Sequence, residues 1–395
     1  MDSGIAEMTV AAGTVISTAM QVLASDSGFV ADVKMADIDT GEISTRLVAL
    51  TPNGRLNQTL LSHQDPTDFM NSNAFRSAIS APYYSSLRLA ALAVPEVRHD
   101  LTGISADIEN ALNLDIQTVA CDDSVLFLLI NNQKPGGVEQ RLFRVFLQST
   151  EDSGLSEIEL SAIELDRGRS VTGLALLDGT LDLMVADPIA GFGIYRLDAY
   201  DDAPVCKPVL LRGAQRYSLN SMVSAVTFSR YGLLLGTAAL ANGALPHGNW
   251  GPELLSLLPD DSWDILIGQP RITADETKLS VSGLLPGLGN PENAAIRAIA
   301  IGSFGQALNT VIAVQTFSGK PVQRREDAHP DIFDYMGVTR FYRTSDFMDW
   351  HPIPIELPRT AGAVTCMALS EAGLLVGHET LGSTAVPFTL FTLQP

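Results

Sequence analysis

The stretch LLLGT at residues 233–237 returns as LLVGH at residues 374–378. Each copy follows a glycine, Gly232 or Gly373, and an earlier apolar run precedes that glycine. Short apolar runs bounded by turn residues indicate buried β-strands. The near identity of the two copies indicates that one block of structure is repeated along the chain.

The apolar run that opens each block can be followed through most of the sequence. Its copies recur at intervals of roughly 50–70 residues, in the range of β-propeller blades. They lie at residues 116–121, 171–176, 224–228, 296–301 and 364–369. A turn containing Asp, Gly or Ser follows each copy, and a second apolar run follows the turn.

The later strands of each block have their own patterns. Apolar and polar residues alternate at 141–146, 193–197, 253–257 and 340–343. This period of two predicts third strands with one face in a core and the other turned outward. Fourth strands are predicted at residues 209–211, 263–267 and 353–357, where prolines in the last run suit an outer edge.

We therefore predict an all-β protein, a single β-propeller domain over residues 1–395. Residues 29–61 form one further block and residues 83–114 a less regular one, which predicts about seven blades, with six as the alternative. The last block stops after a third strand, residues 387–393. We expect the N-terminal strand, within residues 8–23, to pair with residues 388–393 and close the ring. A two-domain α/β protein is the main rival, but the long helices that it needs are missing from the sequence.

Composition limits the classes of partner. The formal net charge is −20, and charged residues make up only 18% of the chain. This charge disfavours nucleic acids and anionic membrane surfaces as partners. The three cysteines are far apart and form no CxxC pair, which predicts buried thiols in a reducing compartment. The N-terminus is acidic and lacks the basic start of a secretory signal, so we expect a cytoplasmic protein. The oligomeric state is left open.

Familiar catalytic motifs are absent from the sequence. It contains no GxSxG, Walker A, HExxH or GxGxxG pattern, and residues 287–290 are interpreted as a turn. Residues 259–263 and 343–350 resemble Asp-boxes, in which an acidic turn precedes a Trp that starts the next strand. We expect these boxes to be structural, because Asp caps turn amides and Trp covers the hairpin.

Three long connections interrupt the repeat, at residues 63–86, 242–252 and 317–337. Propeller sites are built from loops at one end of the central channel. The third connection is the richest in titratable groups, so it supplies the predicted catalytic residues Arg325, His329, Asp331 and Tyr335. The alternative is a solvated charged loop. The predicted substrate-binding residues are Arg76, Tyr84, His247 and Trp250. No metal or other cofactor is expected, because the histidines lack a ligand spacing.

From residue 232 onward the order of motifs resembles a bacterial propeller family that is frequent in cyanobacteria. The resemblance is carried by GLLLGTA (232–238), GPEL (251–254), SW (262–263), SG (282–283) with GN (289–290), FYRTSD (341–346) with Trp350, and GLLVG (373–377). That family includes the propeller part of the enzyme that forms cylindrocyclophanes by alkylating a resorcinol ring with an alkyl chloride. The resemblance implies a site at one mouth that binds a phenolic or carboxylate nucleophile and polarises a leaving group.

The sequence also departs from that family. It lacks the Gly-Gly-x-Gly-x-Asp repeats of the alkylating enzyme, and residues 311–317 contain no acid where the family has an aromatic and acidic run. No catalytic residue is therefore carried over. The main hypothesis is an enzyme acting on a small organic substrate at the channel mouth, by alkylation or cyclisation in specialised metabolism. One alternative is a non-catalytic propeller that binds a protein or ligand. The other is a sialidase-like glycoside hydrolase, which needs two carboxylates about 5–10 Å apart.

Overall fold

The structure is a computed structural model. It describes residues 14–25, 28–37, 43–50, 56–61, 115–121, 125–134, 137–146, 156–163, 165, 168–238, 251–274, 276–304, 307–317, 336–358, 361–381 and 387–393. These residues form an all-β structure of curled antiparallel sheets. The apolar runs of the sequence are thus confirmed as β-strands.

Apart from one small hairpin, the strands among the described residues fall into six up-and-down meanders, in which consecutive strands are neighbours. Meander 1 contains β1 (Thr14–Ser25), β2 (Gly28–Asp37), β3 (Ile43–Leu50) and β4 (Leu56–Leu61). Meander 2 contains β5 (Asp115–Cys121), β6 (Val125–Lys134), β7 (Gly137–Phe146) and β8 (Ser156–Ile158). Meander 3 contains β9 (Ser170–Leu177), β10 (Thr180–Ala186), β11 (Gly193–Asp198) and β12 (Lys207–Leu210). Meander 4 contains β13 (Met222–Ser229), β14 (Gly232–Ala238), β15 (Leu254–Leu257) and β16 (Trp263–Ile267). Meander 5 contains β19 (Asn293–Phe304), β20 (Ala307–Phe317), β21 (Met336–Thr344) and β22 (His351–Ile353). Meander 6 contains β23 (Ala361–Ser370), β24 (Gly373–Leu381) and β25 (Phe388–Phe391).

Between meanders 4 and 5 the chain also makes a small hairpin of β17 (Arg271–Ile272) and β18 (Thr277–Lys278). A short turn labelled α5 (Arg212–Gln215) connects meanders 3 and 4. Gly213 and Ala214 in this turn have positive φ, so α5 is a left-handed turn and not an ordinary helix.

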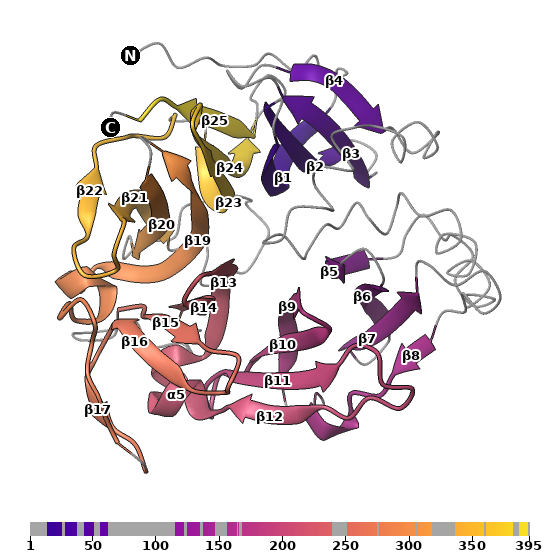
Figure 1. Ribbon diagram of the computed structural model, residues 1–395. Helices are drawn as coiled ribbons and strands as arrows, with labels where there is room; N and C mark the ends of the chain where they lie inside the picture. The colour runs from indigo at the N-terminus through magenta and orange to yellow at the C-terminus, as the bar shows by residue number, and fades with distance from the viewer. Residues whose placement is uncertain are drawn as a thin grey trace.

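The meanders are arranged around a common centre, with the first strand of each nearest to it (Figure 1). Successive first strands contact one another: β5 with β9, β9 with β13, β13 with β19, β19 with β23, and β23 with β1. The opening runs that define the repeat in the sequence are therefore the innermost strands of the structure.

The second strands contain runs of apolar residues, and in β14 both faces of such a run are buried. In β14, Leu233 and Leu235 pack against meander 3, whereas Leu234 packs against meander 5. All three side chains are at most 3% exposed. Burying a leucine contributes about 1.5–3 kcal/mol, so these contacts between meanders are a main source of stability. The run LLLG reflects a strand that is covered on both sides.

The N-terminal strand meets the last meander in a different place from the one predicted. β1 pairs with β2 along its length, and residues Ile16–Thr18 pair with Glu379–Leu381 of β24. Within the described residues the partner of β25 is also β24. Within the described residues β1 does not pair with residues 388–393, so that part of the prediction is wrong for β1, and the closed ring stays a prediction.

One predicted fourth strand is shorter than expected and lies earlier in the chain. β22 ends at Ile353, whereas the sequence predicted a strand over residues 353–357. The Ile355 amide donates to the Ile353 carbonyl at 2.9 Å, so the chain turns out of the ladder directly after β22. The predicted strand at residues 263–267 matches β16 (Trp263–Ile267).

The expectation of buried thiols holds for one of the two cysteines whose exposure is described. Cys206 is buried, and this burial raises the pKa of its thiol. Cys366, on the innermost strand β23, is only half-buried. None of the helices among the described residues is long and apolar enough to cross a membrane.

Candidate functional site

The residues predicted from the sequence to form the site cannot be placed. Arg325, His329, Asp331 and Tyr335, and likewise Arg76, Tyr84, His247 and Trp250, lie outside the described residues. Their roles stay predictions. The strand ends that bracket two of the three long connections are described, and they show which end of the structure these connections belong to.

Those strand ends lie together. Ala238, which precedes the second long connection, pairs with Ala295 near the start of β19. At the same end of meander 5, Asn293 pairs with Thr316, and Phe317 pairs with Met336 across the start of the third connection. We call this end, where first strands begin and second strands end, the loop end.

Each described first strand has a β-bulge four to seven residues before its last residue, and β1, β19 and β23 have a second register shift nearer their starts. The ladder with the second strand shifts register between Ala19 and Gln21, Ile116 and Thr118, Val171 and Gly173, Val223 and Ala225, Ile296 and Ala298, and Val364 and Cys366. The extra residues are Met20, Gln117, Thr172, Ser224, Arg297 and Thr365. Bulges re-aim side chains and are frequent next to binding sites.

Hydrogen bonds join these bulges from one meander to the next. Thr172 Oγ1 donates to the carbonyl of Val223 at 3.5 Å and Ser224 Oγ to that of Ile296 at 2.6 Å, while Arg297 Nε donates to that of Val364 at 3.2 Å. Gln140 Nε2 of meander 2 donates to the Val171 carbonyl at 3.0 Å. Each acceptor directly precedes a bulge. We call the six extra residues the belt.

The belt residues of meanders 3 to 6 are polar, but they include few groups for acid–base chemistry. Thr172, Ser224, Arg297 and Thr365 are all half-buried, while the residue before each of them is buried. In the described first strands the charged residues are Asp115, at the start of β5, and Arg297. The belt can therefore donate and accept hydrogen bonds, and Arg297 gives it a positive charge.

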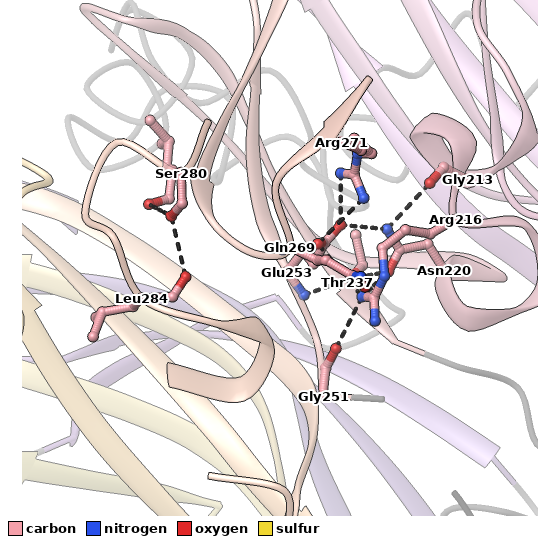
Figure 2. A network of polar contacts seen from close by, with 11 residues as sticks. Gly213, Arg216, Asn220, Thr237, Gly251, Glu253, Gln269, Arg271, Ser280 and Leu284 are labelled. Carbon is pink, nitrogen blue, oxygen red and sulfur yellow. Dashed lines mark hydrogen bonds and ion pairs between the residues drawn. The ribbon is translucent and has the colours of Figure 1, made fainter. Parts of the chain in front are cut away.

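A second polar cluster lies at the loop end, where β14 ends and β15 begins (Figure 2). Glu253, directly before β15, has no exposed surface. Its Oε2 accepts from Asn220 Nδ2 and from Arg271 Nη2, both at 2.8 Å, and its Oε1 accepts from the Gln269 amide at 2.7 Å. Arg216 Nη1 lies 3.5 Å from the same carboxylate.

The partners of Glu253 are themselves fixed. Asn220 Oδ1 accepts from Thr237 Oγ1 at 3.0 Å, and Arg216 Nη1 donates to the Gly251 carbonyl at 3.2 Å. Burial lowers the pKa of Arg216 and Arg271 lowers it further, while Glu253 opposes the shift. An arginine stays protonated in a protein, so the cluster carries two guanidinium groups around one carboxylate.

The neighbouring backbone is strained. Arg212, Ala214, Gln215 and Tyr217 have φ between 51° and 67°, in the left-handed region. This conformation costs about 1–2 kcal/mol per non-glycine residue. The Gly213 carbonyl of this turn accepts from Asn220 Nδ2 at 3.1 Å, so the cluster helps to hold it. The predicted turn at residues 287–290 is also left-handed, with Gly287, Leu288 and Gly289 at positive φ.

The arrangement assigns Glu253 a supporting role. Both of its oxygens are occupied and none of its surface is accessible, so a substrate cannot reach the carboxylate. The cluster ties the connection between meanders 3 and 4 to the end of β14, the start of β15 and the segment that follows β16. Sequence reasoning missed it because its members come from separate parts of the chain, and Glu253 was counted as one polar position of an alternating strand.

The two Asp-box segments are local caps, as expected. Asp260 Oδ1 accepts from the amide and the hydroxyl of Ser262, and Asp346 Oδ1 accepts from the amides of Met348 and Asp349. The Trp350 indole donates to the Phe347 carbonyl at 3.3 Å. Among the described residues no group of three possible metal ligands occurs.

His378 gives a pH-dependent stability. Its side chain is 1% exposed, and burial lowers its pKa from 6.5, opposed by a backbone contact with Glu379. As the pH falls, His378 is protonated in the unfolded chain before it is protonated in the folded protein. Its contribution to the free energy of unfolding is therefore present above pH 6.5 and is lost as the pH falls toward the folded pKa.

We expect His378→Asn to lose less stability than wild type between pH 7.5 and about pH 5.5. Urea unfolding at both pH values measures this, and the exposed His351→Asn variant should keep the wild-type difference.

The chain matches no protein-family model and no curated protein. Among similar solved structures is an endo-arabinase from Bacteroides thetaiotaomicron, with 11% identity over 71% of this chain and 94% of that one, at a TM-score of 0.33. Another is the catalytic domain of a GH62 α-L-arabinofuranosidase from Coprinopsis cinerea, with 9% identity over 71% and 91% and a TM-score of 0.34. TolB from Acinetobacter baumannii matches 95% of this chain and 68% of its own, at 11% identity and a TM-score of 0.32. Identities of 9–11% with TM-scores of 0.32–0.34 do not indicate an activity for this chain.

Proposed function

We propose that the chain is a β-propeller enzyme that binds a small organic substrate at the loop end of its central channel. The meanders are its blades and the first strands line the channel. The belt holds the substrate. The proposed reacting groups, Arg325, His329, Asp331 and Tyr335, belong to the connection that follows β20 at this end.

The belt is the observation that carries this proposal. A bulge recurs in each described first strand, and in meanders 3 to 6 its extra residue carries a hydroxyl or guanidinium group, which in meanders 3, 4 and 5 is hydrogen-bonded to the next meander. Polar groups that converge at the mouth of a channel are typical of small-molecule sites. The strand ends that bracket the second and third long connections lie at the same end.

Alkylation of a phenolic or carboxylate nucleophile remains the proposed reaction class, as the family resemblance implies. Glycoside hydrolysis requires two carboxylates about 5–10 Å apart. The described first strands contribute one, Asp115. A hydrolase would need its second carboxylate from a connection between strands, so the test includes a carbohydrate arm.

The test is a binding experiment on the full chain with a blocked belt. The ligands are resorcinol, 4-hydroxybenzamide, 4-hydroxybenzoate and an arabino-oligosaccharide, followed by saturation-transfer NMR and calorimetry. We expect at least one of the three aromatic compounds to bind, and Thr172→Trp to weaken that binding about tenfold or more by filling the centre. The matched control is Lys207→Trp, on the exposed outer strand β12, which should bind as wild type does.

Two outcomes would overturn the proposal. The first is that no aromatic compound binds, or that Thr172→Trp binds as tightly as wild type while circular dichroism shows both to be folded. The second is release of reducing ends from arabinan by wild type, lost in Thr172→Trp, which would establish a glycoside hydrolase in its place.

A further inference from the structure

The segment that follows β16 has an unusual pattern of exposure. It covers residues 271–274 and 276–285, includes the hairpin of β17 and β18, and is called the rim segment here. Figure 1 shows its hairpin on the outside of the structure, beyond β16 and away from the common centre. Exposed and half-buried residues alternate along its second half. The exposed ones are Thr277, Leu279, Val281, Gly283 and Leu285, and the half-buried ones are Lys278, Ser280, Ser282 and Leu284. The exposed set is mostly apolar and the half-buried set mostly polar, the reverse of an ordinary surface strand.

Polar contacts hold the inner side of the rim segment. The Arg271 guanidinium carbon lies 5.4 Å, and Lys278 Nζ 5.2 Å, from the centroid of the Trp263 ring. Such cation–π contacts are attractive. Ser282 Oγ donates to the Leu266 carbonyl of β16 at 2.7 Å. These contacts use half-buried residues, so the position of the segment does not depend on its exposed apolar side chains.

The outer side of the rim segment presents apolar side chains to water. Ile272 is 79% exposed, Leu279 68%, Leu285 50% and Val281 44%. Ile272 pairs with Thr277 in the hairpin, and residues opposite one another in a ladder point to the same side. Burying a leucine contributes about 1.5–3 kcal/mol, which is not gained while the side chain stays in water. Exposed apolar groups that gather in one place mark surfaces that a partner covers.

The charges of the rim segment are balanced within the same chain. Arg271 Nη2 lies 2.8 Å from Glu253 Oε2. Lys278 Nζ lies 2.5 Å from Glu276 Oε1 and 3.7 Å from Asp264 Oδ1. The chain as a whole carries a net charge of −20, so two copies repel one another at long range. An apolar surface whose cations are paired opposes the approach of a second copy least.

We propose that the rim segment is the interface of a homodimer, in which the outer sides of two segments pack against each other around a two-fold axis. A two-fold axis brings the same patch of both copies together, so apolar groups meet apolar groups. A partner recognised through charge is disfavoured, because Arg271 and Lys278 are already paired. The interface does not depend on the proposed function, since the segment lies outside the belt.

Sedimentation velocity of the full chain, over a range of protein concentrations, tests the interface. We expect wild type to dimerise and Leu279→Glu to raise the dissociation constant of the dimer about 100-fold, because like charges would then meet at the axis. Leu279 is exposed in one copy alone, so the variant should keep its fold, which circular dichroism checks. The matched control is Val205→Glu, before β12. Val205 is 64% exposed but lies outside the rim segment, so this variant should dimerise as wild type does.

The salt dependence of the dimer is a second measurement. Because each copy carries a charge of −20, screening by added sodium chloride should tighten an apolar dimer. A dimer that added salt weakens would be held by ion pairs, and this result would overturn the proposal.

Two further results would contradict the interface. One is a wild-type protein that stays monomeric at every concentration. The other is a Leu279→Glu variant that dimerises as tightly as wild type, since the dimer would then use another surface. If the monomeric wild type floats with phosphatidylcholine vesicles and Leu279→Glu does not, the rim segment binds a lipid surface instead.

Discussion

Replacing Glu253 with alanine is expected to lower the free energy of unfolding by about 3–5 kcal/mol. The carboxylate has no exposed surface and lies among Arg216, Arg271 and Asn220. Its removal leaves two buried guanidinium groups near one another without their shared counter-charge. Desolvation of an unpaired buried charge is costly, and it is this penalty that the variant exposes.

Urea unfolding followed by far-UV circular dichroism measures the loss, provided that the slope with urea stays constant. The matched control is Glu292→Ala. Glu292 pairs with Arg340 at 3.4 Å, but its side chain is 67% exposed, so this change should cost at most about 1 kcal/mol. A Glu253→Ala variant no less stable than Glu292→Ala would show that the cluster does not hold meanders 3 and 4 together.

The strands could be predicted from the sequence because their signal is local. The runs at residues 116–121, 171–176, 224–228, 296–301 and 364–369 all became innermost strands, β5, β9, β13, β19 and β23. Each run is apolar because its faces pack against neighbours, and that pattern survives in any copy of the repeat. The pairing of the N-terminal strand was harder, because apolar patterning does not state which edge a strand will join.

A sequence pattern accompanies the bulges. When the first strands are aligned by their apolar residues, a non-apolar residue follows the first apolar position: Gln117, Thr172, Ser224, Arg297 and Thr365. A strictly alternating strand also places polar residues at regular intervals, so the sequence alone did not separate a bulge from ordinary alternation. The register of the second strand is needed to identify the extra residue.

The Glu253 cluster has no such pattern. Arg216, Asn220, Glu253 and Arg271 come from three different connections of the chain, and only the packing of meander 3 on meander 4 brings them together. The site prediction relied on the density of titratable residues in residues 317–337. Density along the chain identifies groups that are near in sequence, but not those that the fold gathers.

Gly302→Ala is the second large effect that we expect, a loss of about 1–3 kcal/mol. Gly302 lies on β19, where the first strands of meanders 5 and 6 approach closely. A Cβ atom there would lie 2.8 Å from the carbonyl carbon of Leu369 on β23, and closer still to its oxygen. A backbone carbonyl has no rotamer that would move it aside, so the two innermost strands would have to separate.

Gly173→Ala is the matched control, on the first strand of meander 3. Its Cβ would meet Met184 Sδ at 3.5 Å, an ordinary contact, so the variant should match or slightly exceed wild type in stability. If Gly302→Ala is equally harmless, the close approach of β19 and β23 is wrong.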